Sequence, residues 1–349
     1  MRWIRKSKTD TLVLTLVVIL CAAWLPTHAG KIYWSENSCG AAGCTGRIVR
    51  ANLDGSDSEV VVTGGTFPNS RSFFGVALDL QSDKLYWSED DENQFIRRSD
   101  LNGCAAEVVI YPTVPGFAQD LALDIAGSKI YWAGSLESTD GIYRVGMNGS
   151  QLEQPYSGFS PNGLALDLVN GKMYWTRGRQ AGAGIRRANL DGSDVELLVD
   201  GEGYNDIAVD VAAGKIYWAQ KAPGKIRRAN LDGTNPEDVV TLPGSSDSAL
   251  SLALDLSAGK VYWSVRDESV PFNNGRLERA NLDGSGIELL LNQVTAEKLA
   301  LDPLGEGQDP EDCLSPIAVP AMHTSGLLVL VLLLLAAGTV ATVLRVRRP

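Results

Sequence analysis

The sequence predicts an all-β fold, a six-bladed β-propeller of four-stranded antiparallel blades, and three repeated landmarks carry this prediction. A Tyr-Trp pair ends a lysine-led apolar run six times, with successive tryptophans 53, 45, 43, 43 and 45 residues apart. A sustained period in the forties is typical of propellers and other repeat architectures. The other two landmarks are an apolar run that ends in aspartate and an Asp-Gly or Asn-Gly turn. The paired tryptophans are Trp34, Trp87, Trp132, Trp175, Trp218 and Trp263.

Each landmark accounts for part of one blade. An Asp-Gly or Asn-Gly pair between two strand-like runs is a strong hairpin signal, because both central residues need positive φ. Four short strands joined by tight turns make one sheet, which cannot bury both faces alone and must be covered by its neighbours. No helical periodicity competes with this interpretation between residues 31 and 303.

The repeat begins and ends out of phase. The first Tyr-Trp run, residues 31–34, has no aspartate-ended run before it, and the last aspartate-ended run, residues 298–302, has no Tyr-Trp run after it. We therefore predict that residues 298–302 supply the inner strand of the first blade and close the ring. The propeller is expected to occupy residues 30–303.

Both ends of the chain are expected to lie outside the propeller. Basic residues, an apolar run and a small residue at Ala29 predict a cleaved signal peptide over residues 1–29. After a linker at 304–325, the uncharged stretch 326–344 is long enough to span a bilayer, and a basic tail follows at 345–349. The arginines of the tail predict a cytoplasmic C-terminus and an exported propeller at the cell envelope or cell surface.

The C-terminal segment resembles the bacterial sorting signals of the IPTL type. Val319-Pro320-Ala321-Met322 stands where those signals carry Ile-Pro-Thr-Leu, and Ser325 stands where they usually carry tryptophan. The resemblance implies a Gram-negative source and a helix that a sorting protease removes. A plain membrane anchor, which would be retained, stays open beside it.

The repeats resemble the YWTD repeats of the low-density-lipoprotein receptor, also called class B repeats, across residues 31–303. The resemblance implies a six-bladed propeller that binds protein ligands. One departure is consistent: the aspartate that names the repeat is absent from every copy. Its place is taken by Glu36, Glu89, Gly134, Arg177, Gln220 and Val265.

Composition narrows the function classes. The net charge of −11 argues against nucleic acid as a partner, because binding it requires clustered Lys and Arg. His28 and His323 are the only histidines, so the predicted propeller contains neither a Ser-His-Asp triad nor a histidine metal ligand. We predict no catalytic residue, no metal site and no cofactor. A calcium-dependent lactonase-like or hydrolase-like site built on carboxylates stays an alternative.

Four cysteines remain after signal cleavage, and an even number in an exported protein suggests disulfides. Three pairings are possible. Cys104 follows a hairpin turn, on the face where the closing strand exits toward Cys313, whereas Cys39 and Cys44 are expected in one loop on the opposite face. This placement favours Cys39–Cys44 and Cys104–Cys313.

Residues that recur in every blade are expected to be structural. The six tryptophans are predicted to pack in the core rather than to stack on sugars. The aspartates that end the apolar runs are expected to form turns, or to pair with equally repeated arginines, rather than to form a cation ring. These aspartates are Asp79, Asp124, Asp167, Asp210, Asp255 and Asp302, and the arginines are Arg50, Arg98, Arg144, Arg187, Arg228 and Arg279.

Loops that escape the repeat are the better candidates for binding. They lie on the face opposite the Asp-Gly turns, which we call the irregular-loop face, and they carry aromatic and arginine side chains typical of interface anchors. An alternative is that these are solvated loops with a few aromatics plugging the channel. The candidate residues are Phe67, Arg71, Phe73, Phe74, Tyr111, Phe117, Tyr156, Phe159, Arg177, Arg179, Tyr204 and Phe272.

The sequence thus predicts an exported, membrane-anchored, non-enzymatic propeller that engages a protein partner through the irregular-loop face. The alternatives are the calcium-dependent hydrolase and a cell-envelope or matrix protein that binds polysaccharide.

Overall fold

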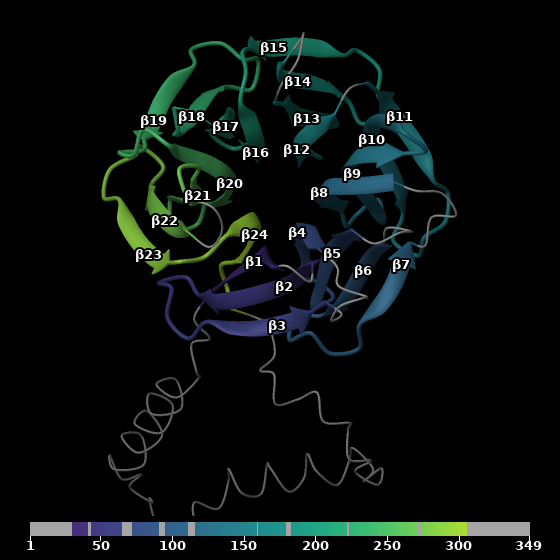
Figure 1. Cartoon of the computed structure of the whole chain (residues 1–349). Coiled ribbons are helices and arrows are strands. Elements are labelled where there is room, and N and C mark those ends of the chain that lie inside the picture. The colour runs from purple at the N-terminus through teal and green to yellow at the C-terminus, as the bar shows by residue number, and fades with distance from the viewer. Residues whose placement is uncertain are drawn as a thin grey trace, which may run out of the picture. The chain divides into compact units, whose positions relative to one another are not determined.

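The computed structural model describes residues 30–40, 43–64, 72–90, 95–110, 116–158, 160–178, 183–221, 223–270 and 274–305. Within these residues, twenty-four strands form six antiparallel sheets of four strands each, arranged as blades around a centre (Figure 1). The predicted all-β six-bladed propeller is therefore confirmed. No helix in the described part of the chain is long and apolar enough to cross a membrane. The predicted signal peptide, membrane helix and tail lie outside that part.

The blades are numbered in chain order, and the strands of each are given from the centre outward. Blade 1 is β24 (Ala296–Asp302), β1 (Lys31–Gly40), β2 (Gly43–Asn52) and β3 (Glu59–Thr63). Blade 2 is β4 (Ser72–Asp79), β5 (Lys84–Asp90), β6 (Phe95–Asp100) and β7 (Glu107–Ile110). Blade 3 is β8 (Gly116–Asp124), β9 (Lys129–Leu136), β10 (Thr139–Gly146) and β11 (Glu153–Ser157).

The other three blades repeat this order. Blade 4 is β12 (Pro161–Asp167), β13 (Lys172–Arg177), β14 (Gly184–Asn189) and β15 (Glu196–Asp200). Blade 5 is β16 (Tyr204–Asp210), β17 (Lys215–Gln220), β18 (Lys225–Asn230) and β19 (Glu237–Thr241). Blade 6 is β20 (Asp247–Asp255), β21 (Lys260–Asp267), β22 (Gly275–Asn281) and β23 (Glu288–Asn292).

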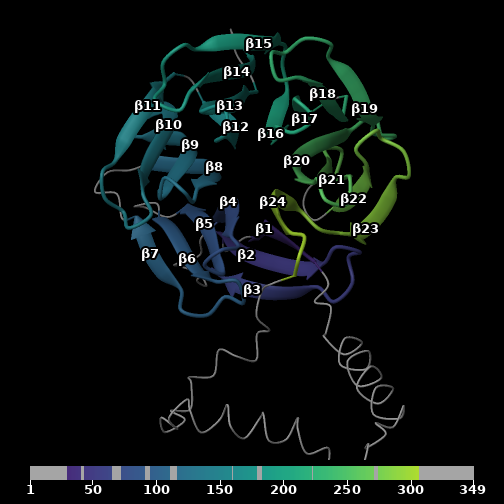
Figure 2. The ribbon, with the colours of Figure 1, turned by 180° about the vertical axis from the view of Figure 1, so that it is seen from behind.

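Strand β24 closes the ring as predicted. It pairs antiparallel with β1, with Asp302 opposite Lys31 and Leu299 opposite Trp34. The sheet of blade 1 is thus built from the two ends of the propeller, and β24 lies beside β1 at the centre in both views (Figures 1 and 2).

The core consists of apolar clusters between neighbouring blades. All six repeat tryptophans are at most 3% exposed, which agrees with their predicted structural role. Each tryptophan packs against the preceding blade, while the tyrosine beside it packs against the following one. Trp34 thus joins Tyr262 of blade 6 in one cluster, and Tyr33 joins Trp87 of blade 2 in another. Because neighbouring side chains in a strand point to opposite faces, one Tyr-Trp pair holds two interfaces.

The repeated aspartates form turns, as one of the predicted alternatives had it. Asp210 Oδ1, for example, accepts the backbone N–H of Ala213 at 2.9 Å, and Asp167 Oδ1 that of Asn170 at 2.9 Å. The other alternative was pairing with the repeated arginines, but Arg98, Arg144, Arg187, Arg228 and Arg279 form ion pairs elsewhere. Those arginines bind a glutamate of the outermost strand instead, as Arg228 Nε binds Glu237 at 2.5 Å.

The same arginines tie successive blades together. Arg228 of blade 5 donates from Nη1 to the backbone carbonyl of Leu282 in blade 6 at 2.9 Å, and Arg279 of blade 6 donates to that of Leu53 in blade 1 at 2.9 Å. Equivalent bonds join Arg98 to Met147, Arg144 to Leu190 and Arg187 to Leu231. The repeated arginine is therefore a contact between blades.

Replacing Arg228 by Met is expected to lower the free energy of unfolding by about 1–3 kcal/mol, because the Leu282 carbonyl and the Tyr217 hydroxyl lose a charged donor. Urea unfolding measures this loss. Glu237→Gln, at the exposed end of the same contact, is the control and should change stability much less. Equal losses in the two variants would assign the effect to the ion pair instead.

Candidate functional site

The structure describes only part of the predicted irregular-loop face. Phe67, Arg71, Tyr111, Phe159, Arg179 and Phe272 lie outside the described residues, so their role in binding stays a prediction. The other six candidates are described, and they divide into core residues and partly exposed residues.

Phe73 and Tyr204 are core residues. Phe73 is fully buried, with its ring 6.1 Å from that of Trp87, and Tyr204 packs edge-on against Trp218 at 5.8 Å. Neither side chain is available to a partner at the surface. The sequence predicts loop positions for both residues, but β4 begins at Ser72 and β16 begins at Tyr204, so both residues belong to inner strands.

Tyr156 and Arg177 are tied into the blades. The Tyr156 ring lies 4.6 Å from that of Trp175, in the interface between blades 3 and 4. Arg177, at the end of β13, is buried. These two residues support the face rather than project from it.

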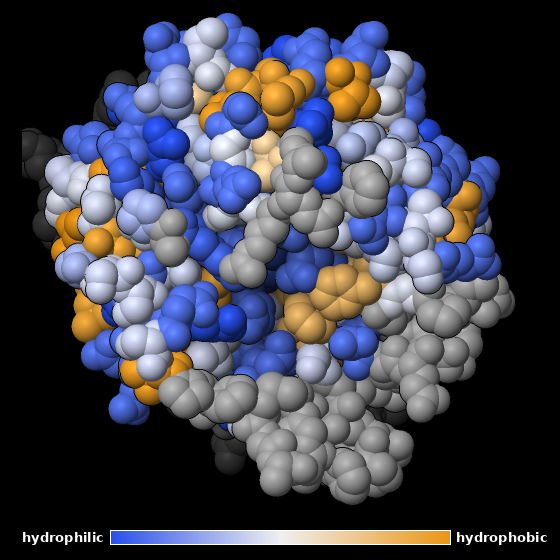
Figure 3. Space-filling model, turned by 45° about the horizontal axis from the view of Figure 1, so that its top comes forward, coloured by the Kyte–Doolittle hydropathy of each residue, from blue (hydrophilic) through white to orange (hydrophobic). Residues whose placement is uncertain are grey.

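Phe74 and Phe117 form an aromatic pair on two neighbouring inner strands. Their centroids are 4.8 Å apart in an edge-to-face arrangement, and both side chains are only partly buried. An exposed aromatic pair of this kind can contribute contact area to an interface. Figure 3 shows one face of the molecule, on which an apolar patch is bordered by hydrophilic side chains near a central hollow.

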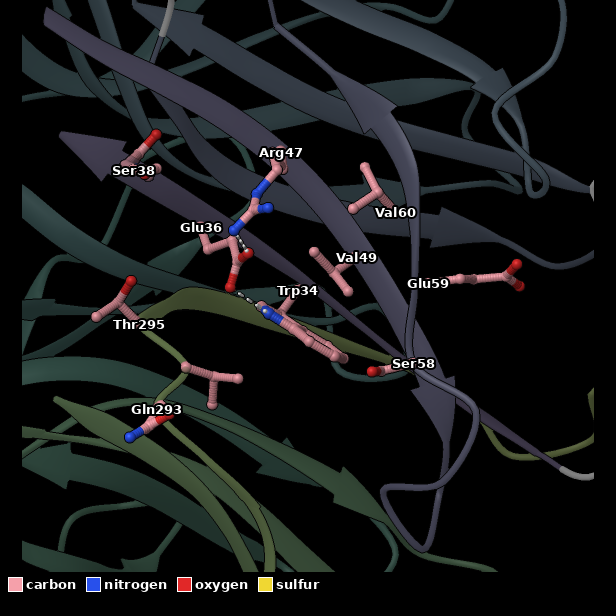
Figure 4. A pocket seen from close by; sticks show the side chains of 12 residues that line it. Trp34, Glu36, Ser38, Arg47, Val49, Ser58, Glu59, Val60, Gln293 and Thr295 are labelled. Carbon is pink, nitrogen blue, oxygen red and sulfur yellow. Dashed lines mark hydrogen bonds and ion pairs between the residues drawn. The ribbon is translucent and has the colours of Figure 1, made fainter. Parts of the chain in front are cut away.

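Two arginines in the described part of the irregular-loop face are paired within the chain. Arg266 binds Glu297 at 2.5 Å, and Arg276 binds Asp247 at 2.8 Å. A polar groove of about 310 Å³ lies over Trp34, beside the segment that precedes β24 (Figure 4). In it, Glu36 accepts the Trp34 indole N–H at 3.1 Å and pairs with Arg47 at 2.5 Å. In blade 1, Glu36, which stands in the place of the YWTD aspartate, therefore binds the tryptophan of its own blade.

Three charged side chains meet at the propeller axis, and the sequence prediction missed them. Lys298 Nζ lies 2.9 Å from Asp120 Oδ2 and 2.7 Å from Asp206 Oδ1. Lys298, Asp120 and Asp206 are only 4–6% exposed. They come from β24, β8 and β16, the inner strands of alternate blades, and each stands four residues before the aspartate that ends its strand. We call these three residues the axial cluster.

Backbone and hydroxyl donors complete the axial cluster. The Ser251 hydroxyl donates to Asp206 Oδ2 at 2.5 Å and accepts the Leu299 N–H at 3.1 Å. Four backbone N–H groups also donate to the two carboxylates, from Leu121 and Leu164 to Asp120, and from Ile207 and Leu252 to Asp206. Every carboxylate oxygen of the axial cluster thus has at least one donor.

In blades 2 and 4, the position equivalent to the axial cluster is a glycine, because the inner strands approach closely there. A Cβ at Gly163 would lie 2.6 Å from Asp206 Cα, and one at Gly75 would lie 2.9 Å from the backbone nitrogen of Leu121. The two glycines alternate with the two aspartates around the axis. This arrangement lets the carboxylates reach the single ammonium group.

Burial dominates the electrostatics of the axial cluster. Removal from water raises the pKa of Asp120 from 3.8 to about 7, with Lys298 opposing and the nearby Asp206 adding to the rise. The pKa of Lys298 is raised too, because the attraction of the two carboxylates outweighs the effect of its burial. Two carboxylates and one ammonium carry a net charge of −1 when all three are ionised, and the raised pKa of Asp120 favours proton uptake by the two coupled carboxylates.

Among the described residues, no three side chains of His, Cys, Asp or Glu are placed to hold a metal ion together. A cation at the level of the axial cluster would compete with Lys298, whose ammonium already lies between the carboxylates. The geometry supports a structural contact there rather than a reaction.

The cysteine positions are described in part. The register of β1 and β2 places Cys39 opposite Cys44, so the two belong to strands rather than to a loop. Cys104, just after β6, takes part in a disulfide, and Cys313 lies outside the described residues. The pairings Cys39–Cys44 and Cys104–Cys313 stay predictions.

Comparison with known proteins supports the propeller assignment. Residues 171–211 match the model of the low-density lipoprotein receptor repeat class B. A low-density lipoprotein receptor-related protein 1 from Pyricularia oryzae is 28% identical over 142 residues, 37% of this chain and 44% of the relative. The match therefore spans less than half of that relative's length. The resemblance to class B propellers is supported, while that to IPTL-type signals stays a prediction.

Solved structures show the same fold at low identity. A chain from the crystal structure of a nidogen/laminin complex matches with a TM-score of 0.63 and 18% identity, over 78% of this chain and 98% of its own. TolB from Acinetobacter baumannii matches with a TM-score of 0.61 and 16% identity, over 83% of this chain and 71% of its own. At such identities the likeness concerns the fold alone.

Proposed function

We propose that the chain is an exported, non-enzymatic binding module, and that the irregular-loop face engages a protein partner. The observation that carries the proposal is the Phe74–Phe117 pair, a partly exposed aromatic contact on neighbouring inner strands of that face. Aromatic side chains bordered by polar groups are typical anchors of protein interfaces. The class B match adds support, since the related fold of nidogen occurs in a complex with laminin.

The position of the two propeller ends fits this proposal. The Gly30 carbonyl accepts the N–H of Leu53, in the Asp-Gly turn of blade 1, at 2.9 Å. A Cβ on Gly30 would lie 2.7 Å from the carbonyl oxygen of Pro303, so both ends lie at the face opposite the irregular loops. With the predicted membrane helix at 326–344, the tether would then start from the face opposite the proposed binding surface.

The test compares three full-length chains. Wild type, a Phe74→Ser/Phe117→Ser variant and a Leu152→Ser/Leu289→Ser control are used to capture proteins from the native cell envelope. The control removes two apolar side chains that are about half exposed on the outer edge of the blades, at 52% and 53%. Binding of the captured protein is then measured with purified components.

The Phe74/Phe117 variant is expected to bind the purified partner at least about tenfold more weakly, while the control binds like wild type. Thermal unfolding of each variant shows whether the propeller is intact. The proposal fails if no protein binds wild type saturably, or if both variants bind equally well. Retention on purified surface polysaccharide without a protein partner would favour the glycan-binding alternative.

A further inference from the structure

The axial cluster is formed only when the ring is closed. Asp120 and Asp206 belong to blades 3 and 5, which are continuous in sequence, but Lys298 belongs to β24, which reaches blade 1 from the end of the propeller. Before β24 docks, the two aspartates face the axis without a counter-ion. Docking of the strand therefore brings the only ammonium group that contacts them within the described residues.

Hydrogen bonds connect the axial cluster to the inner strands of other blades. The Leu299 N–H of β24 donates to Ser251 of β20, whose hydroxyl donates to Asp206 of β16. Asp120 of β8 accepts the Leu164 N–H of β12 as well as Lys298. One hydrogen-bonded network thus includes five of the six inner strands, all of which surround the axis (Figure 2).

The residue that follows the repeat tryptophan also alternates between blades. In blades 2, 4 and 6 the hydroxyl after the tryptophan accepts the backbone N–H at the ring position, as Ser88 does from Gly75 and Thr176 does from Gly163. In blades 3 and 5 this hydroxyl is replaced by Ala133 and Ala219, and an axial aspartate binds the next backbone N–H of its own strand. The axial aspartates therefore occur in the two blades in which alanine follows the tryptophan.

From these contacts we propose that Lys298 is a closure lock, a positioning residue that couples docking of β24 to charge compensation at the propeller axis. The open ring is unfavourable for two reasons. The inner edge of β1 loses its hydrogen-bonding partner, and the two axial aspartates lose their counter-ion, which is costly for buried carboxylates. The lock makes opening of blade 1 costly for blades 3 and 5 as well. The ring consequently opens as a unit rather than fraying at its last strand.

Three full-length variants test the lock. Lys298→Met removes the charge and keeps an apolar stem. Lys298→Met/Asp120→Asn/Asp206→Asn removes all three charges, so no uncompensated carboxylate is left. Glu297→Gln is the matched control, because Glu297 lies on the same strand as Lys298 but binds Arg266 of β21 instead of the axial cluster. Thermal unfolding and hydrogen exchange of the β24 and β1 amides are measured for each.

Lys298→Met is expected to lower the Tm by about 10 °C and to speed exchange in β24 and β1 at least about tenfold relative to β14. The triple variant should recover at least half of the lost Tm and restore slow exchange, and Glu297→Gln should resemble wild type. The proposal is overturned if Lys298→Met behaves like Glu297→Gln, if exchange rises equally in all blades, or if the triple variant is no more stable than Lys298→Met. If Lys298→Met does not fold, the triple variant must fold for the lock to stand.

Discussion

A chain that ends at Thr295, and so lacks β24, is expected to lose cooperative unfolding. Removing this strand exposes the inner hydrogen-bonding edge of β1, because β24 pairs with β1 from Lys31 to Glu36. It also removes Leu299 and Ala296 from the cluster that holds Trp34 between blades 6 and 1. Loss of the inner strand therefore opens one interface and one sheet edge together.

The measurement is urea unfolding followed by tryptophan fluorescence and by far-ultraviolet circular dichroism. We expect a broad transition whose midpoint differs between the two signals, since blades without a closed ring unfold separately. A chain that ends at Gly305 keeps every described strand and serves as the control. A single sharp transition of the Thr295-ended chain, at the midpoint of the control, would contradict the closure that the sheet topology shows.

The closure and the tryptophan core could be predicted because both depend on what the blades share. A residue that recurs at one position of all six blades is easily detected in the sequence. Its simplest role is a structural one that every blade requires. The phase of the repeat then placed residues 298–302 beside residues 31–34 without any knowledge of the structure. The arginine contacts were also visible as a repeat, but their carbonyl acceptors carry no side-chain signature in the sequence.

The axial cluster could not be found in this way, because its members break the repeat. Lys298 and Asp206 lie 92 residues apart, and only three of the six blades carry a charged residue at this position. The available signal was a fixed distance, four residues before the strand-ending aspartate, at which the blades carry Lys, Gly, Asp, Gly, Asp and Ser. Burying a charged residue on an inner strand is unfavourable unless it pairs with an opposite charge. Charged residues at this position therefore indicate an ion pair across the axis.

The sequence predicts that Phe73 lies in the loop before the inner strand of blade 2, whereas β4 begins at Ser72 and includes it. In β4 the register shifts between Phe73 and Val76, so both of these residues point into the core although they are three positions apart. Phe74 lies within the bulge itself and is partly exposed, as expected of a residue on the irregular-loop face.

Stability of the propeller is expected to fall as the pH rises from about 5 to about 8. The pKa of Asp120 is about 7 in the folded state and 3.8 ordinarily, so the folded chain holds a proton in this range that the unfolded chain has released. A raised carboxyl pKa stabilises the fold fully below the unfolded value, and this contribution is lost as the pH rises through the folded value. Three pKa units correspond to on the order of 4 kcal/mol, which is an upper bound here because Asp120 and Asp206 share one ammonium group.

Among the described residues, the other groups with a shifted pKa titrate outside this range of pH. Residues 30–303 contain no histidine, and carboxylates whose pKa is lowered, such as Asp238 beside Lys225, contribute stability that is lost only in more acidic solution. The charged groups that contact Asp120 or share its counter-ion are Lys298 and Asp206, and the polar groups around them are the Ser251 hydroxyl and backbone N–H donors.

The decisive variant is Asp120→Asn, which cannot release a proton. Urea unfolding of wild type at pH 5, 6, 7 and 8 should show a decreasing free energy of unfolding, and Asp120→Asn should flatten that decrease. Asp238→Asn, which removes an exposed carboxylate of blade 5, should leave the slope unchanged. A wild-type profile without slope would mean that the axial carboxylates remain ionised together and that Lys298 alone compensates both, and a slope that survives in Asp120→Asn would mean that another group takes up the proton. The slope therefore measures how completely one ammonium group balances two buried carboxylates at the centre of the ring.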